Sequence, residues 1–158
     1  EMALTVAPTD AIYLGASYFE RDETGNVGQK QESGSLVGKF TQGPLAIGLG
    51  VTRVSQRNAT TKSAEYTNGY NNKAASVGYA VNDDLSVSVT REDSIRQVRN
   101  KLTTQSTNTD VSMEIDTIQA AYTMGGMTIS VSNKQVENDS YTADKKTKET
   151  LFAFAMEF

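Results

Sequence analysis

The sequence predicts an all-β protein, namely a transmembrane antiparallel up-and-down β-barrel with about eight strands in this chain. Bulky apolar residues alternate with small ones in many segments, as where Leu45, Ile47, Leu49 and Val51 alternate with Ala and Gly. Such a period of two is typical of strands with one apolar face. Short and long connections also alternate, and the chain ends on an aromatic residue, Phe158.

Eight strands are expected along the chain. The alternation seen at 45–52 recurs at 75–79, 85–90 and 127–132. We expect strands near 11–21, 32–41, 44–55, 72–81, 84–92, 112–124, 126–136 and 148–158. Residues 2–7 also alternate, and Pro8-Thr9-Asp10 is typical of a turn. Residues 1–10 are therefore interpreted either as the end of a preceding, ninth strand with its periplasmic turn, or as a periplasmic arm.

The connections are expected to differ at the two ends of the strands. Turn-forming Gly, Asn, Asp and Pro predict tight hairpins at 42–44, 82–84 and 125–126. Long polar loops are expected at 22–31, 56–71, 93–111 and 137–147. Short turns at one end and long loops at the other are typical of outer-membrane barrels. No amphipathic helix is predicted.

Composition excludes several classes of protein. The chain has no Cys and no His and a net charge of -4. Disulfide and thiolate chemistry are excluded, and the usual general base and metal ligand are missing. The negative charge argues against nucleic-acid binding. We therefore expect no enzyme, no cofactor and no metal site. No apolar run approaches the roughly 18–20 residues of a membrane helix.

The two faces of the strands suggest different surroundings. The bulky face suits lipid, where a charge would cost about 2–4 kcal/mol at mid-depth, and the small, polar face suits a water-filled lumen. Arg53 and Arg91 have the outward parity but lie near the long loops. Glu114 and Asp116 share that parity, and a bulge, a strand that extends above the membrane or a subunit interface could each explain them. The residues predicted to line the pore are Arg21, Lys39, Gln119, Lys134 and Glu157.

Large apolar residues mark the ends of the strands. Three aromatic residues on the apolar parity precede the short turns and, with the last residue, predict a periplasmic-side girdle of Phe40, Tyr79, Tyr122 and Phe158. The final strand places four large apolar residues on one face. That face resembles the C-terminal assembly signal of outer-membrane barrels, which would consist of Phe152, Phe154, Met156 and Phe158.

Several phrases of the sequence resemble strands and turns of Gram-negative general porins, particularly those of the alphaproteobacterial type. They are Ile12–Tyr18, Ala75–Tyr79, Gln119–Gly126 and the ending Phe152–Phe158. The resemblance implies a water-filled channel for passive diffusion of ions and small hydrophilic solutes. It also implies a trimer with 16 strands per subunit, of which this chain would be the C-terminal half.

The resemblance further implies an outer-membrane location, contact with the lipid bilayer and lipopolysaccharide, and recognition of the last strand by the barrel assembly machinery. In porins an inward-folded loop of the first half forms the constriction, so residues 93–111 are not automatically its equivalent. The alternatives are a small eight-stranded structural or adhesive barrel whose loops bind a partner, an outer-membrane enzyme, and a soluble all-β binding domain. Small lumen residues would underfill a closed eight-stranded barrel, which favours a wider channel.

Overall fold

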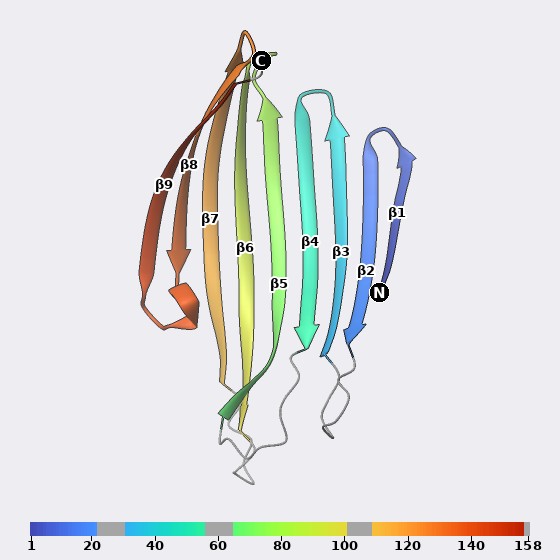
Figure 1. The fold of residues 1–158 in the computed structure, drawn as a ribbon, viewed down its shortest axis with the longest axis vertical. Helices are drawn as coiled ribbons and strands as arrows, with labels where there is room; N and C mark the ends of the chain where they lie inside the picture. The colour runs from blue at the N-terminus through green and yellow to red at the C-terminus, as the bar shows by residue number, and fades with distance from the viewer. Residues whose placement is uncertain (22–30, 56–64, 101–108, 157–158) are drawn as a thin grey trace.

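The computed structural model describes residues 1–21, 31–55, 65–100 and 109–156. Within these ranges the chain forms a single sheet of antiparallel strands, and each strand pairs with its neighbours in sequence (Figure 1). No helix in the described part is long and apolar enough to cross a membrane. The strands are β1 Met2–Thr9, β2 Ile12–Arg21, β3 Gln31–Gln42, β4 Leu45–Ser55, β5 Glu65–Ala80, β6 Leu85–Asn100, β7 Thr109–Met124, β8 Met127–Glu137 and β9 Lys146–Met156.

The described residues thus contain nine strands rather than the expected eight. The additional one is β1, which pairs with β2 from Met2 opposite Tyr18 to Thr9 opposite Ile12. The turn expected at Pro8-Thr9-Asp10 lies two residues later, at Asp10 and Ala11, because Pro8 and Thr9 extend β1 past an irregularity in the register. Strands β1 and β9 are the two edges of an open sheet.

Short turns connect the strands at one end of the sheet (Figure 1). The predicted turns at Gly43, at 82–84 and at Gly125-Gly126 are confirmed. Gly43 and Gly125 adopt φ of 55° and 57°, which glycine tolerates without steric cost. In the turn at 82–84 the side-chain oxygen of Asn82 accepts hydrogen bonds from the backbone N–H groups of Asp84 and Leu85, at 2.9 and 2.8 Å. This local bonding explains why Asn is found there.

The loops expected at 56–71 and 93–111 are shorter than predicted, because β5, β6 and β7 each continue for 16 residues. Residues 65–71, 93–100 and 109–111 are strand. The smaller differences at 22–31 and 137–147 have the same direction, since Gln31, Glu137, Lys146 and Thr147 are also strand. Polar side chains hide the apolar alternation in these extensions, although the backbone pairing continues. The expected loop positions at 22–30, 56–64 and 101–108 lie outside the described residues.

The register places bulky and small residues on opposite faces of the sheet. Directly opposed residues share a face, so the pairs Ile47–Val77 and Val77–Val89 define one face, which we call the bulky face. The pairs Gly48–Ser76 and Ser76–Thr90 define the other, which we call the small-residue face. The large apolar side chains exposed on the strands lie on the bulky face, with the exceptions of Tyr13, Phe19, Val37 and Leu151.

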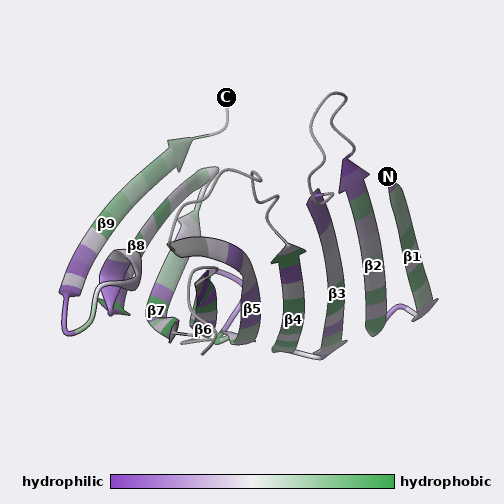
Figure 2. Ribbon diagram, turned by 90° about the horizontal axis from the view of Figure 1, so that it is seen from below, coloured by the Kyte–Doolittle hydropathy of each residue, from purple (hydrophilic) through white to green (hydrophobic). Residues whose placement is uncertain are grey.

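A second layer does not cover either face of the sheet in the described part of the chain. Val136 is the one hydrophobic residue that is buried there. Leu49 and Ile118, in the middle of the bulky face, are both 61% exposed. Viewed along the strands, the sheet bends into a trough with β1 and β9 on its raised sides (Figure 2). The sheet therefore presents its apolar side chains outward instead of enclosing a core.

Candidate functional site on the small-residue face

Four of the predicted pore-lining residues lie on the small-residue face. Lys39 of β3 is opposed to Gly48, and Lys134 of β8 is opposed to Thr117. Both belong to one transverse row, because Gly48 pairs with Ser76, Ser76 with Thr90, and Thr90 with Thr117. Lys134 forms an ion pair of 3.2 Å with Glu149 of β9. The two lysines are therefore at the same level of the sheet, separated by small side chains.

The other predicted pore-lining residues occupy different levels. Gln119 pairs with Ser88, closer to the short turns, and lines a hollow of 410 Å³ with Ala46 and Gly78. Arg21 lies at the opposite end, where it pairs with Gln31. Glu157 lies outside the described residues. The sequence thus identifies a set of residues that share a face but do not converge on one point.

The connection between β8 and β9 folds over the small-residue face. It contains a short 3-10 helix, η1, Asp139–Tyr141. Asn138 initiates it with a left-handed conformation at φ 53°, and its side-chain amide donates to the carbonyl oxygen of Ser112 on β7, at 3.0 Å. Asn tolerates this conformation better than most residues, because its side chain bonds locally. We call residues 138–145 the inward loop.

Asp139 holds the inward loop together. Its carboxylate accepts a hydrogen bond from Thr147 Oγ1 at 2.8 Å and pairs with Lys145 Nζ at 2.9 Å. The hydrogen bonds from Lys145 and Thr147 are the main reason why the pKa of Asp139 falls to about 2. Its backbone N–H also donates to the carbonyl oxygen of Lys145 at 2.9 Å. The loop is closed on itself by these contacts around one carboxylate.

Tyr141, at the end of η1, contacts the small-residue face. Its hydroxyl lies 2.6 Å from Ser94 Oγ, which in turn donates to Asn72 Oδ1 at 2.5 Å. Since Ser94 uses its single proton on Asn72, Tyr141 must be the donor to Ser94. The Tyr141 ring lies 5.5 Å from the ring centre of Tyr70 and 5.1 Å from the guanidinium carbon of Arg96. These contacts connect the loop to β5 and β6.

This cluster was not predicted because Tyr70, Ser94, Arg96 and Tyr141 fall in the expected loops, and only Asn72 lies in an expected strand. Yet the parity of the strands continues through them. Asn72 shares the parity of Ala74 and Ser76 on β5, and Ser94 and Arg96 share the parity of Thr90 on β6. Continuing the even-numbered parity past the last apolar residue would have placed Asn72, Ser94 and Arg96 on the small-residue face. The sequence gives no comparable indication of the conformation of the inward loop, because the four residues with positive φ in it are not glycines.

Arg91 explains the unexpected acidic residues of the bulky face. It forms ion pairs with Glu114, with Asp116 at 3.4 Å and with Asp93 at 3.7 Å. The register of β7 with β6 is continuous through these positions, so a bulge is not the explanation. Arg91 instead pairs laterally with acidic side chains of both β6 and β7, one cation among three carboxylates. No group of His, Cys, Asp or Glu in the described part of the chain could hold a metal ion.

The predicted girdle residues that the structure describes lie on the bulky face near the short turns. Phe40 opposes Ile47, Tyr79 opposes Leu45 and Val87, and Tyr122 opposes Leu85. Phe158, the fourth, lies outside the described residues.

The terminal apolar residues lie on the bulky face of the edge strand β9. Phe152, Phe154 and Met156 are 74%, 60% and 44% exposed. A hollow of 1140 Å³ also lies on the bulky face, where Ala16 and Gly34 are small among larger neighbours. Its lining is mainly apolar, so it is a surface dip and not part of the polar site.

Searches against protein-family models, curated proteins and solved structures gave no match for this chain.

Proposed function

We propose that this chain forms part of the wall of a general porin in a bacterial outer membrane, which admits ions and small hydrophilic solutes by passive diffusion. The observation that carries the proposal is the contrast between the two faces of a sheet with no second layer. One face exposes large apolar side chains such as Leu49, Ile118 and Phe152. The other carries a row of Gly, Ser and Thr between lysines. Lipid outside and water inside suit these faces.

The dimensions of the apolar region support a membrane setting. On β4 the bulky face has no charge between the turn at Pro44 and Arg53, about 30 Å along the strand, and on β6 none between Asp84 and Arg91, about 23 Å. Barrels of the outer membrane carry an apolar band roughly 25 Å tall, which tilted strands cross in about 9–11 residues, so β4 comes close to this length and β6 falls short of it. A soluble sandwich would instead bury this face against a second sheet about 10 Å away.

The strand count favours a wall within a larger barrel. Strands β1 and β9 run in the same direction, because an odd number of antiparallel strands separates them (Figure 1). Antiparallel closure of a single-chain barrel needs an even number. We infer that further strands complete the ring, as in the 16-stranded barrel of a homotrimeric porin. The exposed aromatic face of β9 is then the signal for the assembly machinery, and the bulky face meets lipid and lipopolysaccharide.

Conductance tests the proposal. The full-length protein, purified in detergent and added to a planar bilayer, should produce stepwise increases in current in potassium chloride. No catalytic group takes part, so current should need no substrate or cofactor. Folded protein that inserts in lipid vesicles but conducts no current would contradict the channel.

A structural or adhesive barrel is the second candidate. The observation that favours it is the length of β5, β6 and β7, which continue well past the apolar part of the bulky face. Such extensions would project from the membrane and could present a binding surface. A native mass equal to one copy of this chain, together with absence of current, would favour this candidate over a porin.

A further inference from the structure

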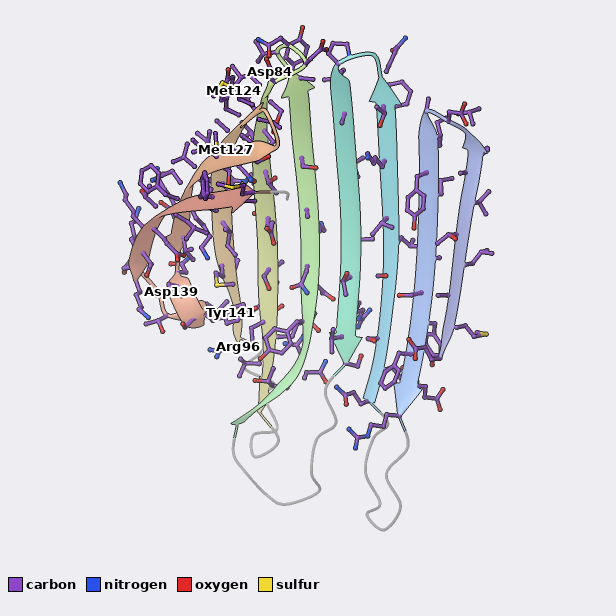
Figure 3. All side chains as sticks on the ribbon, turned by 45° about the horizontal axis from the view of Figure 1, so that its top comes forward. Asp84, Arg96, Met124, Met127, Asp139 and Tyr141 are labelled. Atoms are coloured by element: carbon purple, nitrogen blue, oxygen red, sulfur yellow. The ribbon has the colours of Figure 1, made fainter. Side chains whose placement is uncertain are left out.

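Arg96 is a charged residue on the small-residue face. It lies near the loop-bearing end of β6, opposed to Tyr70 on one side and Val111 on the other. The Tyr141 ring of the inward loop lies 5.1 Å from its guanidinium carbon. Figure 3 shows the two side chains next to each other at this end of the sheet. The loop therefore covers one face of the guanidinium.

The guanidinium has no carboxylate partner in the described part of the chain. Its Nε is buried and makes no hydrogen bond there. The acidic residue on the same face of β6 is Glu92, which is four residues away, or about 13 Å along the strand. Stacking on an aromatic ring occupies the flat face of a guanidinium and leaves its in-plane N–H donors available. The contact with Tyr141 thus fixes the charge without neutralising it.

The neighbours of Arg96 are neutral and already bonded to one another. Tyr141 donates to Ser94, and Ser94 donates to Asn72. This chain of hydrogen bonds positions the Tyr141 ring over Arg96. It offers no negative charge to the guanidinium.

The small-residue face has an excess of positive charge although the chain as a whole carries a net charge of -4. Among the side chains that the structure describes on its strands, the acidic ones are Glu92 and Glu149, and Glu149 is paired with Lys134. Lys39 has no ion-pair partner among the described residues. The cationic residues of this face are Arg21, Lys39, Arg96 and Lys134.

We propose that Arg96, held by Tyr141 of the inward loop, is a contact for small anions that bear carboxylate or phosphate oxygens. A guanidinium can donate two parallel hydrogen bonds to two such oxygens. A chloride ion is a single atom and cannot accept this pair of bonds in the same way. The inference rests on the proposed channel and specifies its solute class. The row of Gly, Ser and Thr lies on the same face, six residues from Arg96 along β6, and leaves a path along the wall, so the contact can be transient, as passage through a channel requires.

Reversal potentials of the full-length protein in planar bilayers, measured in gradients of potassium acetate and potassium chloride, test the proposal. Arg96→Gln should lower the acetate-to-potassium permeability ratio about twofold to threefold, because one unit charge near the path is lost. Arg53→Gln is the matched control: it removes the same charge from the bulky face, and the ratio should not change. Arg96→Lys should keep the chloride ratio but lose the preference for acetate over chloride, because an ammonium lacks the planar fork.

The outcomes separate this proposal from the channel itself. Current with an unchanged acetate ratio in Arg96→Gln overturns the anion contact and leaves the porin in place, as does an equal change in Arg53→Gln. Absence of current from the unaltered protein overturns both. If Arg96→Gln fails to fold, Arg96→Lys decides: an acetate preference equal to that of the unaltered protein overturns the contact.

Discussion

The two halves of the sheet differ in how far their bulky face stays apolar. On β2 and β4 the apolar stretch continues to Tyr18 and Val51 before a charge appears. On β6 and β7 it ends earlier, at Arg91 and Asp116, although these strands are longer. The longer strands continue beyond the apolar region as a polar sheet held by lateral ion pairs. Apolar height and strand length are therefore independent properties of this fold.

The small-residue face shows the same division. Over β3 and β4 it is bare, with Gly48 and Gly50 in the strand. Over β5 to β7 the inward loop covers it and brings Tyr141 to Ser94 and Arg96. The first half resembles a plain wall, whereas the second half carries the polar contacts that could discriminate between solutes.

The largest expected effect comes from placing a charge on the bulky face in the apolar region. Ile118 and Gln119 are neighbours on β7 that point to opposite faces. Ile118→Lys should destabilise the folded protein in lipid by about 2–4 kcal/mol, because the ammonium would face hydrocarbon. Gln119→Lys should be tolerated. Urea unfolding of both variants in lipid vesicles gives the comparison, and equal stability of the two would refute the assignment of the faces.

The apolar half of the fold could be predicted from the sequence, and for a physical reason. A strand such as β4 alternates Leu45, Ile47 and Leu49 with small residues, so both its existence and its facing can be deduced from a period of two. The turns could also be predicted, because Gly43 adopts a positive φ and the Asn82 side chain accepts a hydrogen bond from the backbone of its own turn. In this half the turn-forming residues and the apolar alternation therefore predict the same strands and turns.

The polar half could not be predicted in the same way. Residues 65–71 and 93–100 are strand because their backbones pair with each other, which is a non-local property. Most residues of these two segments are polar, so hydropathy indicates a loop. The ion pairs of Arg91 with Glu114 and Asp116 depend on the register between β6 and β7. The contact of Tyr141 with Arg96 connects residues far apart in sequence and depends on the fold of the inward loop.

The next effect in size concerns the irregular start of β5. Asn68 is an extra residue between the pairs Thr67–Val98 and Gly69–Gln97, so β5 has a bulge there. Gly69 is buried, and a Cβ at this position would collide with the carbonyl oxygen of Val54 on β4. Gly69→Ala should therefore destabilise the protein by about 1–3 kcal/mol, because the backbone must shift.

Gly34 on β3, which like Gly69 lies on the bulky face, provides the control from the other half of the sheet. A Cβ there would lie 3.6 Å from the carbonyl oxygen of Ser17, which is ordinary contact. Gly34→Ala should change the free energy of unfolding by no more than about 0.5 kcal/mol. Urea unfolding in vesicles measures both variants. If Gly34→Ala were as damaging as Gly69→Ala, the close approach of β4 and β5 at the bulge would not be the cause.

The smallest expected effect is the response of the inward loop to acid. The pKa of Asp139 is about 2 in the folded protein against an ordinary value of 3.8, chiefly because Lys145 and Thr147 donate hydrogen bonds to its carboxylate. Because the pKa is depressed in the folded loop, the ionised carboxylate stabilises the loop fully at pH values above the ordinary pKa of 3.8. This contribution is lost as the pH falls toward 2. Hydrogen exchange of the loop amides in micelles, corrected for the intrinsic rate at each pH, should therefore show opening below about pH 4.

Asp139→Asn should open the loop at neutral pH and abolish this dependence. Asp144→Asn removes the same charge from the same loop but leaves the contacts of Asp139 in place, so it should retain the acid transition. An acid transition that persists in Asp139→Asn would show that another group holds the loop over the small-residue face.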